Sequence, residues 1–102
     1  MTYESDLKKF NFLRKKPPKS DYFSTHFKDR CSDRNLPLTE VKVILKKGKI
    51  QGFISQEIND YKVLFEWNVE KDLNIYVNFP RNGGMRFKSV HLTPSGNRKR
   101  SS

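Results

Sequence analysis

The sequence contains few of the residues that disulfides, zinc centres and membrane spans require. Of its 102 residues, one is cysteine and two are histidine. An internal disulfide is therefore excluded, and a zinc site built from cysteine and histidine is not expected. Residues 1–20 lack the continuous apolar stretch of a signal peptide, and no apolar run is long enough to cross a bilayer. We expect a cytoplasmic protein without a membrane partner, cofactor or metal, although a toxin delivered into the cytoplasm of a target cell would show the same features.

Acidic residues are also scarce: 11 oppose 21 lysines and arginines, which leaves a net charge of +10. The excess gathers at the two ends. Residues 1–20 hold six basic and two acidic side chains, and residues 94–102 hold three basic and no acidic ones. Such basic arms suit a polyanion, most often nucleic acid, unless they serve only as solubilising tails. We therefore predict a basic arm at 1–20 with a short helix in 1–16, a single domain at 21–93, and a basic tail at 94–102.

Residues 22–34 have the apolar period of a helix. The buried stripe would consist of Phe23, Phe27 and Cys31. The same arc carries a polar triplet one turn apart, made of His26, Arg30 and Arg34. An unpaired buried charge costs on the order of several kcal/mol, so packing alone would not place the triplet there. The triplet indicates a polar groove, unless its arginines extend past the apolar edge into solvent and His26 is structural.

The rest of the chain reads as one more helix and four strands. Asn35-Leu36-Pro37 ends the first helix, and residues 39–47 are predicted to form a second, closed by Gly48 in a left-handed conformation. Beyond Gly48 the apolar period changes from about 3.6 to 2. This change predicts strands at 49–57, 61–67, 72–79 and 85–93. The predicted fold class is therefore α+β, with two N-terminal helices packed on a four-stranded antiparallel sheet.

The last predicted strand adds further candidate side chains. Strict alternation places His91 on one face with Phe87, Ser89 and Thr93. It places Arg86 and Lys88 on the other face. If helix 22–34 packs on the His91 face, His26 and His91 could act as a base and an acid. Otherwise His91 is an ordinary exposed strand histidine.

The spacing Ser24-x-His26-x-x-x-Arg30-x-x-x-Arg34, followed by a helix ending at Gly48 and a β-meander, resembles a family of small domains found among bacterial toxins. These domains are similar to the RelE- and BrnT-type ribonuclease toxins. The resemblance covers residues 23–93 and implies a RelE-like two-layer fold and metal-independent cleavage of RNA, with the triplet in the groove. This chain departs from the family at Phe27, where a small residue is common, and its basic arms lie outside the match.

The chemistry of such a cleavage agrees with the residue types present. It needs a base for the 2′-hydroxyl, cations for the phosphate and an acid for the leaving oxygen. Histidine, with an ordinary pKa of about 6.5, suits proton transfer, and arginine grips phosphate without losing its proton. The candidate catalytic residues are His26, Arg30 and His91. The candidate nucleic-acid contacts are Arg34, Arg81, Arg86, Lys88 and Thr93.

Two other classes of function remain open at this stage. One is a non-catalytic nucleic-acid-binding module that stacks bases on Tyr61, Trp67, Tyr76 and Phe87. The other is an adaptor that binds a protein through its sheet edge. The expected partners are RNA or another nucleic acid and, for a toxin, an acidic antitoxin or immunity protein.

Overall fold

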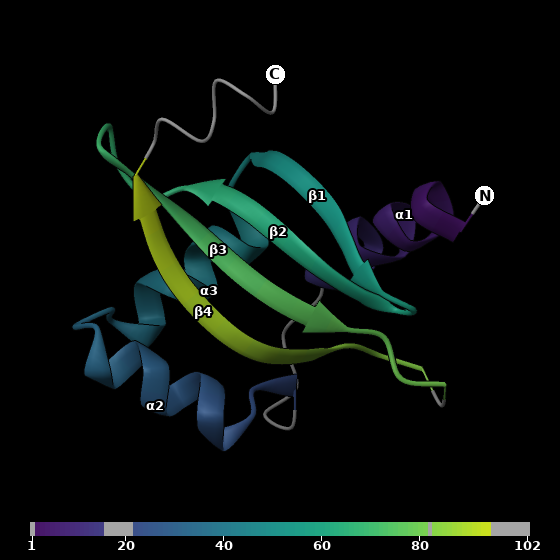
Figure 1. Ribbon diagram of the computed structural model, residues 1–102, viewed down its shortest axis with the longest axis horizontal. Coiled ribbons are helices and arrows are strands. Elements are labelled where there is room, and N and C mark those ends of the chain that lie inside the picture. The colour runs from purple at the N-terminus through teal and green to yellow at the C-terminus, as the bar shows by residue number, and fades with distance from the viewer. Residues whose placement is uncertain (1, 16–21, 82, 95–102) are drawn as a thin grey trace.

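The computed structural model describes residues 2–15, 22–81 and 83–94, which form three helices and one sheet (Figure 1). The helices are α1 (Thr2–Arg14), α2 (Thr25–Asp33) and α3 (Leu38–Lys47). The strands are β1 (Ile50–Glu57), β2 (Asp60–Glu66), β3 (Lys71–Asn78) and β4 (Arg86–Pro94). They pair antiparallel in the order β1-β2-β3-β4, which confirms the predicted α+β class. Within the described ranges, no helix has the length and apolarity that a membrane span requires.

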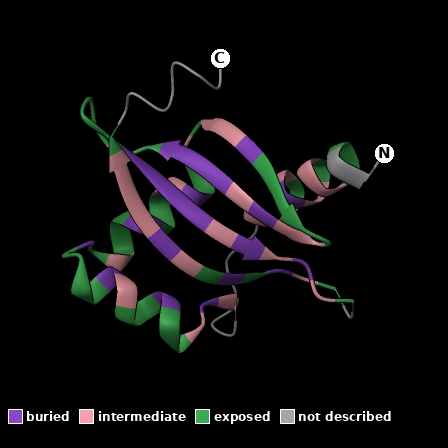
Figure 2. Cartoon of the chain, viewed as in Figure 1, coloured by how far each residue is buried: buried purple, intermediate pink, exposed green. Residues whose placement is uncertain are grey.

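The core lies between the helices and one face of the sheet. Buried residues follow one another along the middle of β2 and β3 (Figure 2). The strands contribute mainly β-branched and aromatic side chains, which suit a pleated, half-buried surface. Those buried against the helices include Val63, Phe65, Leu73, Ile75, Val77 and Val90. We call the opposite face of the sheet, which the helices do not cover, the outer face.

Helix α1 belongs to this core, although the fold class was predicted with two helices. Phe10 is fully buried, and its ring centroid lies 5.8 Å from that of Phe53 and 6.4 Å from that of Phe65. The Tyr61 hydroxyl donates a 2.7 Å hydrogen bond to Asp6. The core therefore includes residues of the predicted arm 1–20, on the N-terminal side of the domain boundary expected after residue 20. The rest of the predicted basic arm, 16–20, and the basic tail from residue 95 onward lie outside the described residues.

Arg14 joins α1 to the end of α3. Its Nε donates to the carbonyl oxygen of Leu45 at 2.6 Å, and Nη2 donates to that of Ile44 at 3.4 Å and also to that of Gly48. Its guanidinium lies 5.2 Å from the centroid of the Phe65 ring. Burial lowers the pKa of Arg14, but an arginine remains protonated at neutral pH. This half-buried cation thus adds hydrogen bonds to carbonyls at and just beyond the C-terminal end of α3, which is the negative end of the helix dipole.

Gly48 ends α3 in a different way from the one predicted. Its φ is −65°, so the left-handed cap inferred from the sequence is wrong. A Cβ at this position would lie 2.5 Å from the carbonyl oxygen of Ile44. Close packing at the end of the helix, rather than a positive φ, therefore requires glycine here.

Helix α2 has well-defined caps at both ends. The Ser24 hydroxyl accepts a 3.0 Å hydrogen bond from the backbone N–H of Phe27. At the other end Asn35 has a φ of 54°, and the N–H of Leu36 donates to the carbonyl of Cys31 at 2.8 Å. This is a Schellman ending with asparagine in the position that glycine usually takes. The caps fix the length of α2 and therefore the row of side chains that it carries.

The N-terminal end of α2 is attached to the edge strand β4. The ring centroids of Phe23 and Phe87 are 4.9 Å apart, and those of Phe27 and Phe87 are 5.9 Å apart. Ser24 donates to the carbonyl oxygen of Phe87 from its hydroxyl at 3.0 Å and from its backbone N–H at 3.4 Å. Phe23 and Phe87 also form a single parallel β-bridge. Aromatic packing and main-chain hydrogen bonds together hold α2 beside β4 (Figure 1).

A β-bulge in β4 changes which side chains face the core. Val77 is opposite Phe87 and Tyr76 is opposite Ser89, so Lys88 is the extra residue between them. After the bulge, Val90 returns to the buried face, opposite Ile75. The extra residue shifts the alternation by one position.

The shift contradicts the predicted faces of this strand. Phe87, Val90 and Leu92 share the face that packs on the helices, because each is paired with a core residue of β3. The outer face instead receives the polar side chains of β4, namely Arg86, Lys88, Ser89, His91 and Thr93. A strict period of two cannot predict this arrangement, since it assumes a regular ladder.

Candidate functional site

Helix α2 presents its polar triplet at the edge of the sheet. His26 and Arg34 are exposed, and the Arg30 side chain is 40% exposed. Arg30 Nε donates a long hydrogen bond of 3.4 Å to His26 Nε2. Its Nη1 lies 4.0 Å from Asp33 Oδ2, a separation at which a solvated ion pair contributes little. The Arg30 guanidinium therefore retains donors for a ligand.

His91 lies half-buried on the outer face of β4. Its ring meets that of Tyr76 edge to face, with centroids 5.5 Å apart, and its Nε2 lies 3.4 Å from the Ser89 hydroxyl oxygen. Burial lowers the pKa of His91, and the charges of Arg34, Arg30 and His26 lower it further. The imidazole is therefore neutral at neutral pH and can accept a proton.

These electrostatic effects link the helix to the strand. Helix α2 packs on Phe87 and therefore on the helix-covered face of β4, whereas His91 lies on the outer face of the same strand. The condition set by the sequence, that helix 22–34 packs on the His91 face, is therefore not met, and the positive charges of the triplet act on His91 from beside the edge strand. We call this edge of the sheet, where α2 lies beside β4, the α2–β4 junction. The hydrogen bonds from Ser24 to the Phe87 carbonyl and the packing of Phe23 and Phe27 on Phe87 hold α2 in this place.

Thr93 is held in the same part of the outer face by a buried amide. Asn74 Nδ2 donates to Thr93 Oγ1 at 2.7 Å, and Asn74 is 3% exposed. Asn74 is also the residue directly opposite His91 on β3. Because the Thr93 oxygen accepts from Asn74, its own proton is directed elsewhere and can be donated to a ligand.

The remaining predicted nucleic-acid contacts lie farther along the sheet. Arg86 begins β4, roughly 15 Å from His91 on an extended strand, and Arg81 is exposed in the β3–β4 loop. Lys88 Nζ lies 3.1 Å from Asp60 Oδ2, so its charge is partly neutralised. The predicted site is therefore divided into a junction near His91 and a basic end near the β3–β4 loop.

The burial of the aromatic residues corrects one prediction and adds a site residue. Tyr61 is 3% exposed and Phe87 is 1% exposed, so their interpretation as stacking surfaces is wrong. Trp67 and Tyr76 remain half-exposed. Tyr76, which contacts His91, was not predicted as a partner of the histidine. Its alternation in phase with Asn74 and Asn78 is the sequence signal for the polar face of β3.

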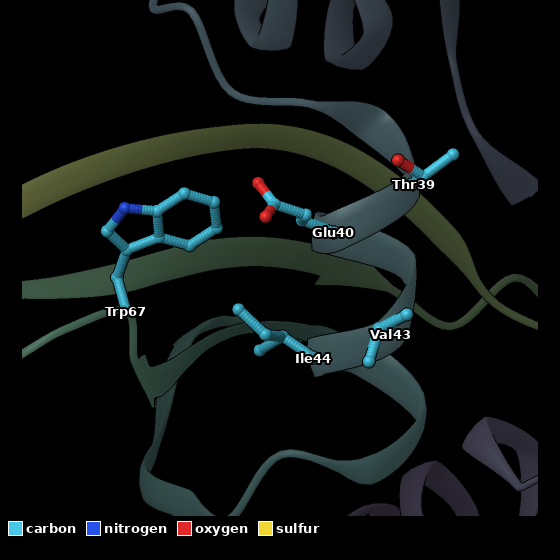
Figure 3. A pocket seen from close by; sticks show the side chains of 5 residues that line it. All are labelled: Thr39, Glu40, Val43, Ile44 and Trp67. Atoms are coloured by element: carbon cyan, nitrogen blue, oxygen red, sulfur yellow. The ribbon is translucent and has the colours of Figure 1, made fainter.

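A hollow opens on the helix side of the molecule, between α3 and the end of β2. It measures about 490 Å³, and Figure 3 shows Glu40 and Ile44 of α3 pointing toward Trp67, with Val43 turned away. Thr39 completes its lining. Trp67, predicted as a stacking residue of a binding module, lines this hollow, but none of the predicted catalytic or phosphate-binding residues does, so it is separate from the α2–β4 junction.

Two further observations complete the description of the site. Among residues 2–15, 22–81 and 83–94, no three histidine, cysteine or acidic side chains are placed to hold a metal ion together. Cys31 is buried in the core, and burial raises the pKa of its thiol.

Comparison with protein-family models, with curated proteins and with solved structures finds no match to this chain. The functional assignment must therefore come from the geometry.

Proposed function

We propose that this chain is a toxin-like, metal-independent endoribonuclease whose site is the α2–β4 junction. The observation that supports the proposal is the attachment of α2 to β4 through Ser24 and Phe23, because it puts the triplet and His91 on two elements that lie side by side. The spacing of His26, Arg30 and Arg34, which resembles that of toxin ribonucleases, points to the same chemistry.

Each residue at the junction has a distinct role in this reaction. His91, neutral at physiological pH, accepts the proton of the RNA 2′-hydroxyl, whose oxygen then attacks the adjacent phosphorus. Arg30 and Arg34 bind the phosphate oxygens and stabilise the charge that develops on them. As the bond to the 5′-oxygen breaks, His26 donates a proton to that leaving oxygen. The products are a 2′,3′-cyclic phosphate and a free 5′-hydroxyl.

Binding of the phosphate would also strengthen the base. The positive charges of Arg34 and Arg30 contribute to the lowered pKa of His91 in the free protein. A bound phosphate neutralises part of that positive field, so the pKa of His91 rises toward its ordinary value. The histidine thus becomes a better proton acceptor when the substrate is in place.

A non-catalytic RNA-binding module is the second candidate. The half-exposed ring of Tyr76 and the exposed side chains of Arg81 and Arg86 favour it, because stacking and phosphate contacts suffice for binding. For either function, the predicted basic arms would add a salt-dependent attraction to RNA. For a toxin, the predicted partner is an acidic antitoxin or immunity protein.

The decisive experiment is cleavage of defined RNAs by the purified full chain in the presence of EDTA. We expect fragments ending in a 2′,3′-cyclic phosphate. His26→Ala and His91→Ala should each lower the rate by about 10²- to 10⁴-fold, the range typical of general acid–base residues. Arg30→Lys should also be harmful, because an ammonium cannot reproduce the guanidinium fork.

The matched control is Lys28→Ala, which removes an exposed cation from α2 outside the triplet. It should leave the rate unchanged. Thermal midpoints of all variants, measured in parallel, separate loss of chemistry from loss of folding. RNA that is bound but not cut would select the binding module, and full activity in His91→Ala would overturn the proposal.

A further inference from the structure

A second hollow lies on the outer face, at the end of the sheet where the β1–β2 hairpin turns. Its volume is about 300 Å³. The polar, charged or stacking side chains considered for a ligand are those of Gln56, Glu57, Asp60, Tyr76 and Lys88, and Tyr61 and Val77 complete the lining. The hollow lies on the same face as His91, because Tyr76 borders it and also contacts the His91 ring. A hollow at the small end of the range for ligand sites has room for one planar heterocycle.

The two carboxylates of this hollow differ in what they already bind. Asp60 Oδ1 accepts a 2.5 Å hydrogen bond from Asn78 Nδ2, and Asp60 Oδ2 lies 3.1 Å from Lys88 Nζ. In the part of the chain that the structure describes, no such partner holds the carboxylate of Glu57. Glu57 is therefore the acceptor that remains available to a ligand.

A carboxylate beside an RNA site is informative because it repels the phosphates of the substrate. It can favour binding only by accepting hydrogen bonds from donors on a base. Guanine is the base that presents two adjacent donors, N1–H and N2–H, to the two oxygens of one carboxylate. Adenine and cytosine place an acceptor beside their amine, and uracil places acceptors on both sides of its one N–H. Gln56 Nε2 lies 3.5 and 3.4 Å from the carbonyl oxygens of Ile54 and Ser55, and these long contacts leave the exposed amide able to turn and donate to guanine O6.

Tyr76 supplies the surface against which a base can stack. Its ring is half-exposed on the outer face, and its edge-to-face contact with His91 holds it at the border between the hollow and the histidine. Stacking on an aromatic ring favours every base, whereas hydrogen bonds to the base edge distinguish one base from another. Tyr76 therefore contributes affinity and Glu57 contributes selectivity.

We propose that this hollow is the base subsite of the enzyme and that Glu57 and Tyr76 select guanine, so that cleavage occurs on the 3′ side of guanosine. The inference rests on the proposed ribonuclease function, because the 2′-hydroxyl that His91 activates belongs to the nucleotide whose base is held. Binding of a guanine base is nevertheless measurable without cleavage.

The test compares dinucleotides and mononucleotides on the full chain. GpA should be cleaved faster than ApA, CpA or UpA. Glu57→Gln replaces one acceptor with a donor, and should slow cleavage of GpA by about 10- to 100-fold while changing that of ApA by less than about threefold. Glu70→Gln, an exposed carboxylate in the β2–β3 turn, is the matched control and should change neither. Tyr76→Ala should slow the cleavage of all four dinucleotides, because each base loses its stacking surface. Tyr76→Phe keeps the ring and should retain the order of the four cleavage rates.

Binding of 3′-GMP and 3′-AMP, measured by calorimetry, separates this inference from the function on which it rests. Tighter binding of 3′-GMP that Glu57→Gln removes would support the subsite even if no RNA were cut. Cleavage with no preference among bases, or a guanosine preference that Glu57→Gln leaves intact, would overturn the subsite while the ribonuclease function stands.

Discussion

Two arginines on two helices of this protein have opposite environments. Arg14 donates to main-chain carbonyls at the end of α3 and lies against the Phe65 ring. Among the residues that the structure describes, the partners of the Arg30 guanidinium are His26, at a long 3.4 Å, and Asp33, at 4.0 Å. The N–H groups of Arg14 are mostly engaged in hydrogen bonds within the protein, whereas most N–H groups of Arg30 remain available to a ligand. Charge alone therefore does not distinguish a structural arginine from a binding one, but the partners of its N–H groups do.

The same difference separates the place where α1 meets α3 from the place where α2 meets the sheet. Where α1 meets α3, the half-buried guanidinium of Arg14 joins the two helices. At the α2–β4 junction the phenylalanine cluster and Ser24 do this, and the charged side chains are left at the surface. Three substitution pairs, and one substitution compared with the parent chain, test this contrast.

The largest effect is expected in the phenylalanine cluster of the α2–β4 junction. Phe87→Ala should lower the free energy of unfolding by about 3–5 kcal/mol, because it opens a cavity among Phe23 and Phe27. Phe12→Ala, at a ring that is 61% exposed, should cost less than about 1 kcal/mol. Urea unfolding measures both. Equal losses would mean that the cluster does not hold α2.

The second largest effect on stability is expected at Arg14, compared with Arg30. Arg14→Met keeps the helix propensity and the apolar stem but removes the bonds to the α3 carbonyls, and should cost about 2 kcal/mol. Arg30→Met should change stability by less than about 0.5 kcal/mol and act on activity instead. Thermal denaturation and RNA cleavage, measured on both variants, give the comparison directly. A reversed order would contradict the roles assigned here.

A smaller effect is expected at the cap of α2. Ser24→Ala removes a side chain that accepts from Phe27 N–H and donates to the Phe87 carbonyl, and should cost about 1 kcal/mol. Ser32→Ala, at an exposed position within the same helix, should be close to neutral. Chemical denaturation resolves the two. If activity of Ser24→Ala falls more than its stability explains, the cap also positions the triplet.

The smallest effect is the pH dependence that His91 gives to stability. Its pKa is lowered in the folded protein by burial and by nearby positive charges, so below about pH 6.5 the unfolded chain binds more protons than the folded one. Stability should therefore fall as pH decreases from 6.5 through the folded pKa, and level off below it. The thermal midpoint of His91→Asn should depend less on pH between 5 and 7 than that of the parent chain. Identical pH profiles would contradict the lowered pKa.

The element order could be predicted because it depends on local periodicity. The helical period before Gly48 and the two-residue period after it predicted α3 and the four strands, with bounds within one residue of those observed. The caps of α2 also have a local signal, since Ser24 and Asn35 are typical residues for those positions. These features need only the neighbouring residues along the chain.

The parts that could not be predicted depend on residues far apart in sequence. The bulge at Lys88 shifts the alternation of β4, so the residues after it lie on the face opposite to the one predicted. No residue type within Arg86–Thr93 indicates a bulge at this position. The bonds from Arg14 to α3 span about thirty residues, so its role could not be distinguished from that of Lys15 beside it. Tyr61 and Tyr76 have the same chemistry, but opposite faces of the sheet make one a core residue and the other a surface.

The bridge between Phe23 and Phe87 has a consequence for the order in which the molecule folds. The Ser24 bonds to β4 span 63 and 64 residues, among the longest separations in the structure. Closing so large a loop costs chain entropy that only the finished contacts repay. During synthesis, the sheet segments up to β3 emerge before α2 has a strand to attach to. The junction that we propose cuts RNA is thus assembled last, and a nascent chain without β4 beside the ribosome's own RNA has no complete site.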